Sequence, residues 1–133
     1  MRRATVKVYP FHLDMYGHVN NARYLEFLES ARWDFIAENM DLRELEKLGI
    51  TFLVVNININ YRHPAILGHI LEIHTRMSHI SGKSAKVHQE IRIKGSDRIV
   101  AEADITFVII DNPSQKVLPI KGDLRNIVDN LRD

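Results

Sequence analysis

The chain has 133 residues, of which 45% are hydrophobic and 26% charged, proportions that fit one globular domain spanning residues 1–133. A formal charge of +1 leaves no broad basic field for nucleic acid, and the lack of cysteine excludes disulfides, thiolate metal sites and a cysteine nucleophile. No secretory signal and no apolar run of membrane-spanning length is present, so we expect an intracellular, cytoplasmic protein without a membrane partner.

The first predicted element is a short strand over residues 4–11, where Val6 and Val8 alternate with more polar residues. Proline has no N–H for a sheet ladder, so Pro10 confines this strand to a sheet edge or ends it. A loop follows through residues 12–18.

Two helices are predicted next. Asn20 or Asn21 can cap the first, because an asparagine side chain accepts a hydrogen bond from an orphan backbone N–H. This helix has about five turns and ends near Asn39. Residues 41–48 form a second, short helix, with an aspartate at its start and a glycine after it. The apolar face of the long helix repeats at helical spacing through Tyr24, Leu28, Ala31 and Phe35.

From Ile50 onward the apolar residues alternate with polar ones, which is typical of strands. Long strands separated by turns are predicted over residues 50–61, 70–78, 84–94 and 98–110, with a short strand at 116–119 and a terminal helix through Leu124, Ile127, Val128 and Leu131. Three asparagines share one face of the first of these strands: Asn56, Asn58 and Asn60. Because asparagine is depleted in strands, that face is either a solvated surface or a polar patch at a dimer interface or pantetheine channel.

This order of elements predicts an α+β fold, with one antiparallel sheet whose apolar face is covered by the long helix. At about 1.5 Å per helical residue and about 3.3 Å per strand residue, the helix matches the strands in length, so the sheet can wrap around it. The open edges of such a sheet favour pairing with a second copy, and we expect a dimer at least.

The loop and the start of the long helix carry a distinctive run, Asp14-Met15-Tyr16-Gly17-His18-Val19-Asn20-Asn21-Ala22-Arg23-Tyr24, followed by Glu29 and Arg32. This run resembles the signature of the 4-hydroxybenzoyl-CoA thioesterase family of hotdog proteins. Other stretches are similar to members of the same family and extend the resemblance over nearly the whole chain: Tyr24-Leu25-Glu26-Phe27-Leu28-Glu29, Ala31-Arg32-Trp33-Asp34, Val54-Val55-Asn56-Ile57-Asn58-Ile59-Asn60-Tyr61-Arg62, Gly82-Lys83-Ser84 and Ile105-Thr106-Phe107-Val108.

The resemblance implies a hotdog fold and hydrolysis of a fatty, long-chain acyl-CoA to free fatty acid and CoA. It also implies a homodimer or homotetramer and neither a metal nor another cofactor. The alternatives are a thioesterase for acyl-carrier protein or for an aromatic acyl-CoA, and a non-catalytic acyl-binding hotdog protein. A slot lined by aliphatic side chains would favour fatty acyl groups, and the residues expected to line it are Leu28, Val55, Ile57 and Phe107.

Thioester hydrolysis needs a base or nucleophile near the carbonyl carbon and donors for the developing oxyanion. By resemblance Asp14 fills the first role, either as general base or as nucleophile, and the backbone N–H of Asn21 fills the second. The first N–H groups of a helix suit that second role, since they lack intrahelical partners and carry partial positive charge. Local sequence alone favours a turn or capping role for Asp14.

His18 is a supporting candidate four residues after Asp14. It could orient the carboxylate or form half of a metal site, but hydrogen bonding within the loop is the interpretation we favour. The seven histidines show no HExxH or similar ligand spacing, so we predict no metal.

Four further residues are candidates for substrate binding: Asn20, Tyr24, Arg62 and Lys83. Tyr24 also fits core packing, because it lies on the apolar helix face. Arg62 and Lys83 flank strand ends, where they are either surface charges or contacts for the CoA phosphates. Arg32 is expected to form a structural salt bridge with Glu29, Asp14 or a partner subunit.

Overall fold

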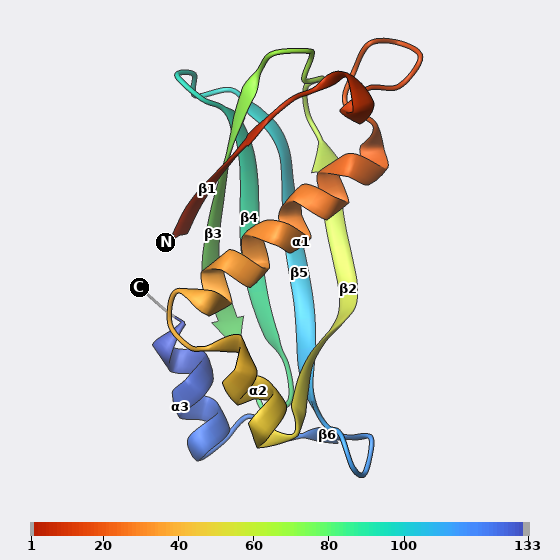
Figure 1. Cartoon of the computed structure of the whole chain (residues 1–133). Helices are drawn as coiled ribbons and strands as arrows, with labels where there is room; N and C mark the ends of the chain where they lie inside the picture. The colour runs from red at the N-terminus through yellow and green to blue at the C-terminus, as the bar shows by residue number, and fades with distance from the viewer. Residues whose placement is uncertain (1, 132–133) are drawn as a thin grey trace.

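A computed structural model describes residues 2–131 of the chain. Its elements in order are β1 (Arg2–Lys7), a 3-10 helix (Pro10–His12), α1 (Asn21–Ala37), α2 (Leu42–Leu48), β2 (Ile50–Tyr61), β3 (Ile70–Ile80), β4 (Ala85–Ile93), β5 (Ile99–Asp111), β6 (Lys116–Leu118) and α3 (Asp123–Asn130) (Figure 1). Within these residues, none of the helices has both the length and the apolar character that crossing a bilayer requires.

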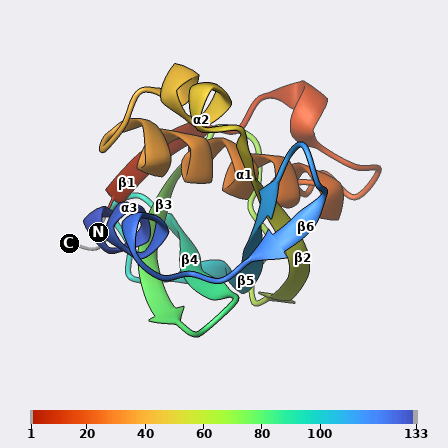
Figure 2. The ribbon, with the colours of Figure 1, turned by 90° about the horizontal axis from the view of Figure 1, so that it is seen from below.

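The strands form one antiparallel sheet in the order β1-β3-β4-β5-β2, and β6 pairs with the end of β5. The sheet curves around α1, which lies across its concave face, while α2 and α3 lie at one end (Figure 2). The predicted α+β hotdog arrangement, a sheet wrapped around a long helix, is therefore confirmed.

Both predicted helix starts are present. The Oδ1 atom of Asn20 accepts a hydrogen bond from Ala22 N at 2.8 Å, and Asp41 caps α2 in the same way through Arg43 N at 2.9 Å. Gly49 ends α2 with a φ of 68°, a left-handed conformation that glycine adopts without steric cost. The buried face of α1 consists of Tyr24, Phe27, Leu28, Ala31 and Phe35.

The first strand differs from its predicted range, because β1 begins at Arg2 and ends at Lys7 rather than covering residues 4–11. Pro10 starts a 3-10 helix, and the backbone N–H of Tyr9 bonds to Nδ1 of His12 at 2.9 Å instead of to a neighbouring strand. β1 is an edge strand of the sheet and ends before Pro10, so both outcomes that the proline allowed are present.

The core beneath α1 divides into two apolar clusters. One surrounds the N-terminal half of α1 and includes Tyr24, Leu28 and Ile73, while the other packs beneath α2 and α3. Two polar side chains, Thr75 on β3 and Gln89 on β4, are fully buried on the same inner face of the sheet. Each needs a hydrogen-bond partner there, since an unpaired buried polar group is costly.

The edge strand β2 is exposed on both faces over residues 53–58, which the alternation of its sequence did not indicate. A register shift between Val54 and Asn56 places a bulge at Val55, so the strict alternation breaks in its middle. Leu53, Val55 and Ile57 are 46%, 54% and 37% exposed. These apolar side chains lie on an unpaired sheet edge, where their exposure to water is unfavourable.

Candidate active site

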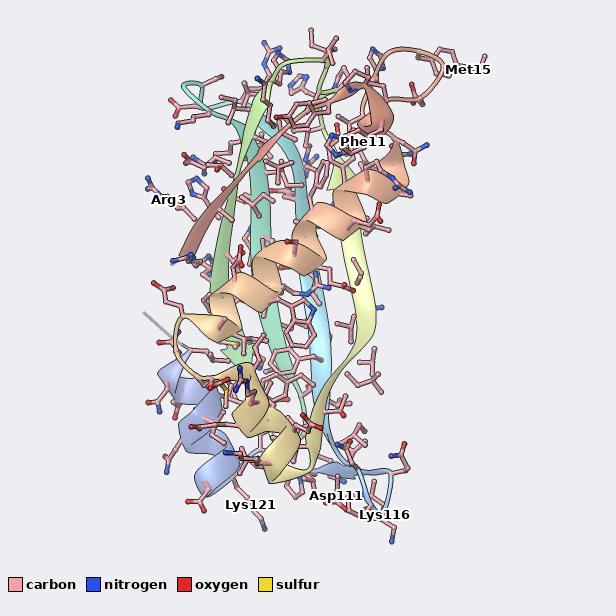
Figure 3. The ribbon with its side chains drawn as sticks, in the orientation of Figure 1. Arg3, Phe11, Met15, Asp111, Lys116 and Lys121 are labelled. Carbon is pink, nitrogen blue, oxygen red and sulfur yellow. The ribbon has the colours of Figure 1, made fainter. Side chains whose placement is uncertain are left out.

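A pocket of about 230 Å³ lies where the loop before α1, the first turn of α1 and the end of β2 meet. This is the end of the molecule at which Figure 3 labels Phe11 and Met15, opposite the end that carries Asp111, Lys116 and Lys121. The side chains around the pocket come from three segments of the chain: Asp14, His18 and Val19; Asn21 and Tyr24; Tyr61, Arg62, His63 and Pro64.

Backbone hydrogen bonds hold the loop in place. Short bridges pair Leu13 with Val19 and His18 with Ile66, and Val19 N donates to the carbonyl oxygen of Ala65 at 2.9 Å. The loop that carries Asp14 is thus fastened to the segment after β2 rather than free in solvent.

The Asp14 carboxylate is bound on one side by its own loop. Its Oδ1 atom accepts hydrogen bonds from Tyr16 N at 2.9 Å and His18 N at 3.2 Å, and Gly17 adopts a φ of 77° to close the turn. The other oxygen, Oδ2, accepts no hydrogen bond from any residue in 2–131. Asp14 therefore combines the turn role with a held carboxylate that has one oxygen left for water or substrate.

Asn20 and Asn21 have different roles at the start of α1. Asn20 is the cap, and its side chain satisfies Ala22 N. The backbone N–H of Asn21 donates to no acceptor among the described residues, and Asn21 lines the pocket. An orphan N–H at the positive end of a helix is a donor for a carbonyl oxygen that becomes negative.

Tyr24 is buried beside this start, and its hydroxyl oxygen accepts a hydrogen bond from Ala65 N at 3.2 Å. Burial raises the pKa of the Tyr24 phenol above its usual value, with smaller raising contributions from Tyr61 and Asp14, while the Ala65 N–H opposes the shift. The side chain is thus a neutral wall of the pocket that also packs in the core.

Tyr61 is a pocket residue to which sequence reasoning assigned no role. Its hydroxyl donates to the carbonyl oxygen of Asn21 at 3.3 Å, and its ring lies 5.7 Å from that of Tyr24. The signal that could have identified it is its place at the end of the Asn-Ile-Asn-Ile-Asn-Tyr-Arg strand, which the chain shares with the family it resembles.

The remaining predicted residues separate into two locations. His18 and Arg62 line the pocket, and the Arg62 guanidinium also pairs with Glu102 on β5. Lys83 lies in the turn between β3 and β4, where Gly82 O accepts from Ile120 N at 2.7 Å, close to Lys121 at the opposite end of the sheet (Figure 3). One copy of the chain therefore does not bring Lys83 to the pocket.

A second cavity, of about 260 Å³, lies between the C-terminal half of α1 and the sheet. Most of its wall is apolar: Trp33, Phe35, Ile36, Phe52, Leu53, Val54, Met77, Val87, Ile105, Phe107 and Leu131, together with Glu29 and Arg32. Of the aliphatic slot predicted from sequence, Phe107 lines this cavity, but Leu28, Val55 and Ile57 do not. Leu28 packs in the core, and Val55, at the bulge in β2, is more than half exposed.

The side chains in 2–131 that come closest to a metal-binding arrangement are His88, Glu90 and Glu102, on the outer face of the sheet. Their potential ligand atoms lie within 4.8 Å of one another. Arg92 binds Glu90 and Arg62 binds Glu102, so both carboxylates already have a cationic partner. Asp14 and His18 are not part of this cluster, and its carboxylates are accounted for by these ion pairs.

Residues 8–128 match the model of the thioesterase-like superfamily. The chain is 46% identical to the long-chain acyl-CoA thioesterase FadM of Escherichia coli K12 over 95% of its own length and 96% of that protein. Its structure is similar to that of YbaW, a probable thioesterase from Escherichia coli, with a TM-score of 0.92, 44% identity and 98% of each chain covered. A Staphylococcus aureus protein solved in complex with CoA shares the fold at a TM-score of 0.86 and 13% identity, covering 97% and 82% of the two chains.

Proposed function

The chain belongs to the thioesterase-like superfamily, and from that premise we propose that it hydrolyses long-chain acyl-CoA to free fatty acid and CoA. The observation that carries this proposal is the meeting of Asp14 and the orphan N–H of Asn21 in one pocket. The apolar cavity along the same helix suits a fatty chain. The similarity to FadM supports the choice of a long acyl chain linked to CoA.

In the proposed mechanism the thioester carbonyl oxygen binds at the N–H of Asn21, where the helix dipole stabilises the charge that develops on it. The free Oδ2 atom of Asp14 either removes a proton from a water molecule, which attacks the carbonyl carbon, or attacks that carbon directly. In both routes the carbon–sulfur bond breaks and CoA leaves as the thiolate. The sulfur then takes a proton, from the protonated Asp14 in the general-base route and from solvent in the direct route. In the direct route water then hydrolyses the anhydride formed between Asp14 and the acyl group.

The other predicted residues have supporting roles in this proposal. The hydrogen bond from His18 N to Asp14 Oδ1 supports an orienting role for the His18 segment. Tyr24 and Asn20 shape the wall and the helix start, and Arg62 is the cation available at the pocket for a CoA phosphate. Lys83 can serve the same site only if a second copy of the chain brings it there.

We further propose a homodimer formed through the β2 edges, or a homotetramer built from such dimers. The support is the exposed apolar edge of β2, which consists of Leu53, Val54, Val55 and Ile57. Pairing two such edges would continue the sheet and remove these side chains from water.

The test is thiol release from straight-chain acyl-CoAs of increasing length, an aromatic acyl-CoA and an acyl-carrier protein thioester. We expect kcat/KM to rise with chain length and to be highest for long-chain acyl-CoA. Preference for the carrier-protein or aromatic thioester would favour those alternatives. Binding of acyl-CoA without thiol release would favour a non-catalytic acyl-binding protein.

A further inference from the structure

Arg32 lines the apolar cavity between α1 and the sheet, and its guanidinium group is held by a residue of β4. Its Nη1 atom donates to Oε1 of Gln89 at 3.1 Å, and Nε2 of Gln89 donates to Leu28 O and to Oγ1 of Thr75, both at 3.0 Å. Gln89 and Thr75 are fully buried, so the group that positions Arg32 is itself fixed. Neither Glu29 nor Asp14, two of the expected salt-bridge partners, holds this side chain within residues 2–131; the structure pairs it with a neutral amide.

The other donors of this guanidinium have no acceptor among residues 2–131, and no ion pair joins Arg32 to Glu29 or Asp14 there. Burial lowers the pKa of the Arg32 guanidinium and the charge of Glu29 opposes that shift, yet arginine remains protonated in proteins. The unused donors of Arg32 are not among the buried unpaired atoms of residues 2–131, so water reaches them. A ligand that displaces this water from the apolar cavity must supply an acceptor in its place, because an unpaired charge there would be costly. The cavity thus suits a chain that is apolar over most of its length and carries an oxygen at one position.

The distance along α1 indicates where that oxygen would lie. Asn21 and Arg32 are eleven residues apart on α1, which corresponds to about 16 Å at the helical rise. The arginine side chain leans back toward the N-terminus of the helix and shortens this distance by a few ångströms. An extended peptide spans about 3.3–3.6 Å per residue, which contains three backbone bonds, so an extended acyl chain advances about 1.2 Å per bond. The acceptor would therefore lie about ten to thirteen bonds from the thioester carbonyl.

We propose that Arg32 determines specificity by binding an oxygen function near the far end of the acyl chain, which makes distally oxygenated long-chain acyl-CoAs a substrate class of this site. A terminal carboxylate fits best, because guanidinium and carboxylate form two parallel charge-assisted hydrogen bonds. A hydroxyl or oxo group offers the same kind of acceptor with one bond. This inference rests on the proposed thioesterase function and adds a second recognition point to it.

The experiment compares two substrates of equal length, tetradecanoyl-CoA and the CoA monothioester of tetradecanedioic acid. We expect the wild-type protein to have the higher kcat/KM for the carboxylate-bearing substrate. Arg32→Met should reduce this preference by about 10- to 100-fold, the range for a hydrogen bond to a charged group, mainly through KM. Arg32→Lys should retain part of the preference, because lysine keeps the positive charge but cannot form two parallel hydrogen bonds to one carboxylate.

Two controls separate recognition from structural damage. Arg125→Met makes the same replacement on α3, where the side chain pairs with Asp129, and should leave the preference unchanged. Hexanoyl-CoA and its carboxylate-bearing counterpart are too short to reach Arg32, so their ratio should be the same in wild type and Arg32→Met.

A wild-type protein that disfavours the tetradecanedioic thioester would overturn the inference, and that measurement does not depend on how any variant folds. An Arg32→Met protein that folds and keeps the wild-type preference would overturn it as well. If the wild type releases no thiol from tetradecanoyl-CoA, the proposed thioesterase function is contradicted instead. Failure of the Arg32 inference and failure of the proposed function are therefore distinguishable.

Discussion

The hydroxyl of Tyr61 donates a hydrogen bond to the backbone carbonyl oxygen of Asn21 at 3.3 Å, joining the end of β2 to the first turn of α1. The two residues are 40 positions apart in the chain. The bond lies one residue from the cap and beside the orphan N–H that we assign to the oxyanion. We therefore expect Tyr61 to position that donor.

Replacing Tyr61 by phenylalanine removes this bond and keeps the ring beside Tyr24. One such bond contributes about 0.5–1.5 kcal/mol, so we expect kcat to fall by up to about tenfold with KM little changed. Steady-state thiol release measures both constants. Tyr9→Phe, at an exposed tyrosine before the 3-10 helix, is the matched control and should behave as wild type. A loss confined to KM would argue against a positioning role.

Asp14→Asn tests the proposed base or nucleophile. An asparagine oxygen can still accept from Tyr16 N and His18 N, so the loop should keep its shape while the free carboxylate oxygen is lost. We expect kcat to fall by about 100-fold or more, the usual contribution of an acid–base group. Circular dichroism and the oligomeric mass should stay unchanged.

The control for that variant is Asp34→Asn, the same change at an exposed aspartate on α1. It should retain wild-type turnover. Near-wild-type turnover in Asp14→Asn would refute the assignment of Asp14 and return it to a turn role alone.

Val55→Asp tests assembly through β2. The side chain is 54% exposed at the bulge, so a charge there should cost the folded protomer little, yet in a paired edge it would be buried. We expect light scattering at micromolar concentration to show a protomer mass for the variant and at least twice that mass for wild type. Val117→Asp on β6, at a valine that is 42% exposed, is the matched control and should keep the wild-type mass. A wild-type protomer mass would contradict the proposed dimer.

Acid stability should depend on Glu90 on the outer face of the sheet. Burial raises the pKa of its carboxyl, but hydrogen bonds and charge from Arg92 and His88 outweigh that effect and bring the pKa below the usual 4.5. Because the folded pKa is the lower one, this stabilisation is present above pH 4.5 and is lost as pH falls through the folded pKa. Glu90→Gln should therefore flatten the acid side of the stability curve.

Denaturant unfolding between about pH 3 and pH 6 measures this effect. The partly solvated pairing limits the difference to about 1 kcal/mol at the upper end of that range. Glu46→Gln, at an exposed glutamate on α2, is the control and should leave the pH dependence as in wild type. Equal pH profiles for wild type and Glu90→Gln would contradict the role of this carboxylate.

Local chemistry made much of the fold predictable from sequence. The caps at Asn20 and Asp41 and the stop at Gly49 act on backbone groups within a few residues, so their outcome does not depend on distant contacts. Alternation likewise predicted the buried faces of β3, β4 and β5, because successive side chains point to opposite faces of a strand. The loop from Asp14 to the helix start was identified as the place for a site by its resemblance to the family signature, since its local chemistry alone favoured a turn.

Only the tertiary structure decided which distant residues join that site. Tyr61 reaches Asn21 because β2 ends beside the start of α1, while Lys83 falls at the far end because β3 runs the length of the sheet before its turn. Arg32 meets Gln89, 57 positions away, rather than Glu29 on its own helix. Sheet order and the curvature around α1 set these distances, and neither is contained in the spacing of residues along a single element.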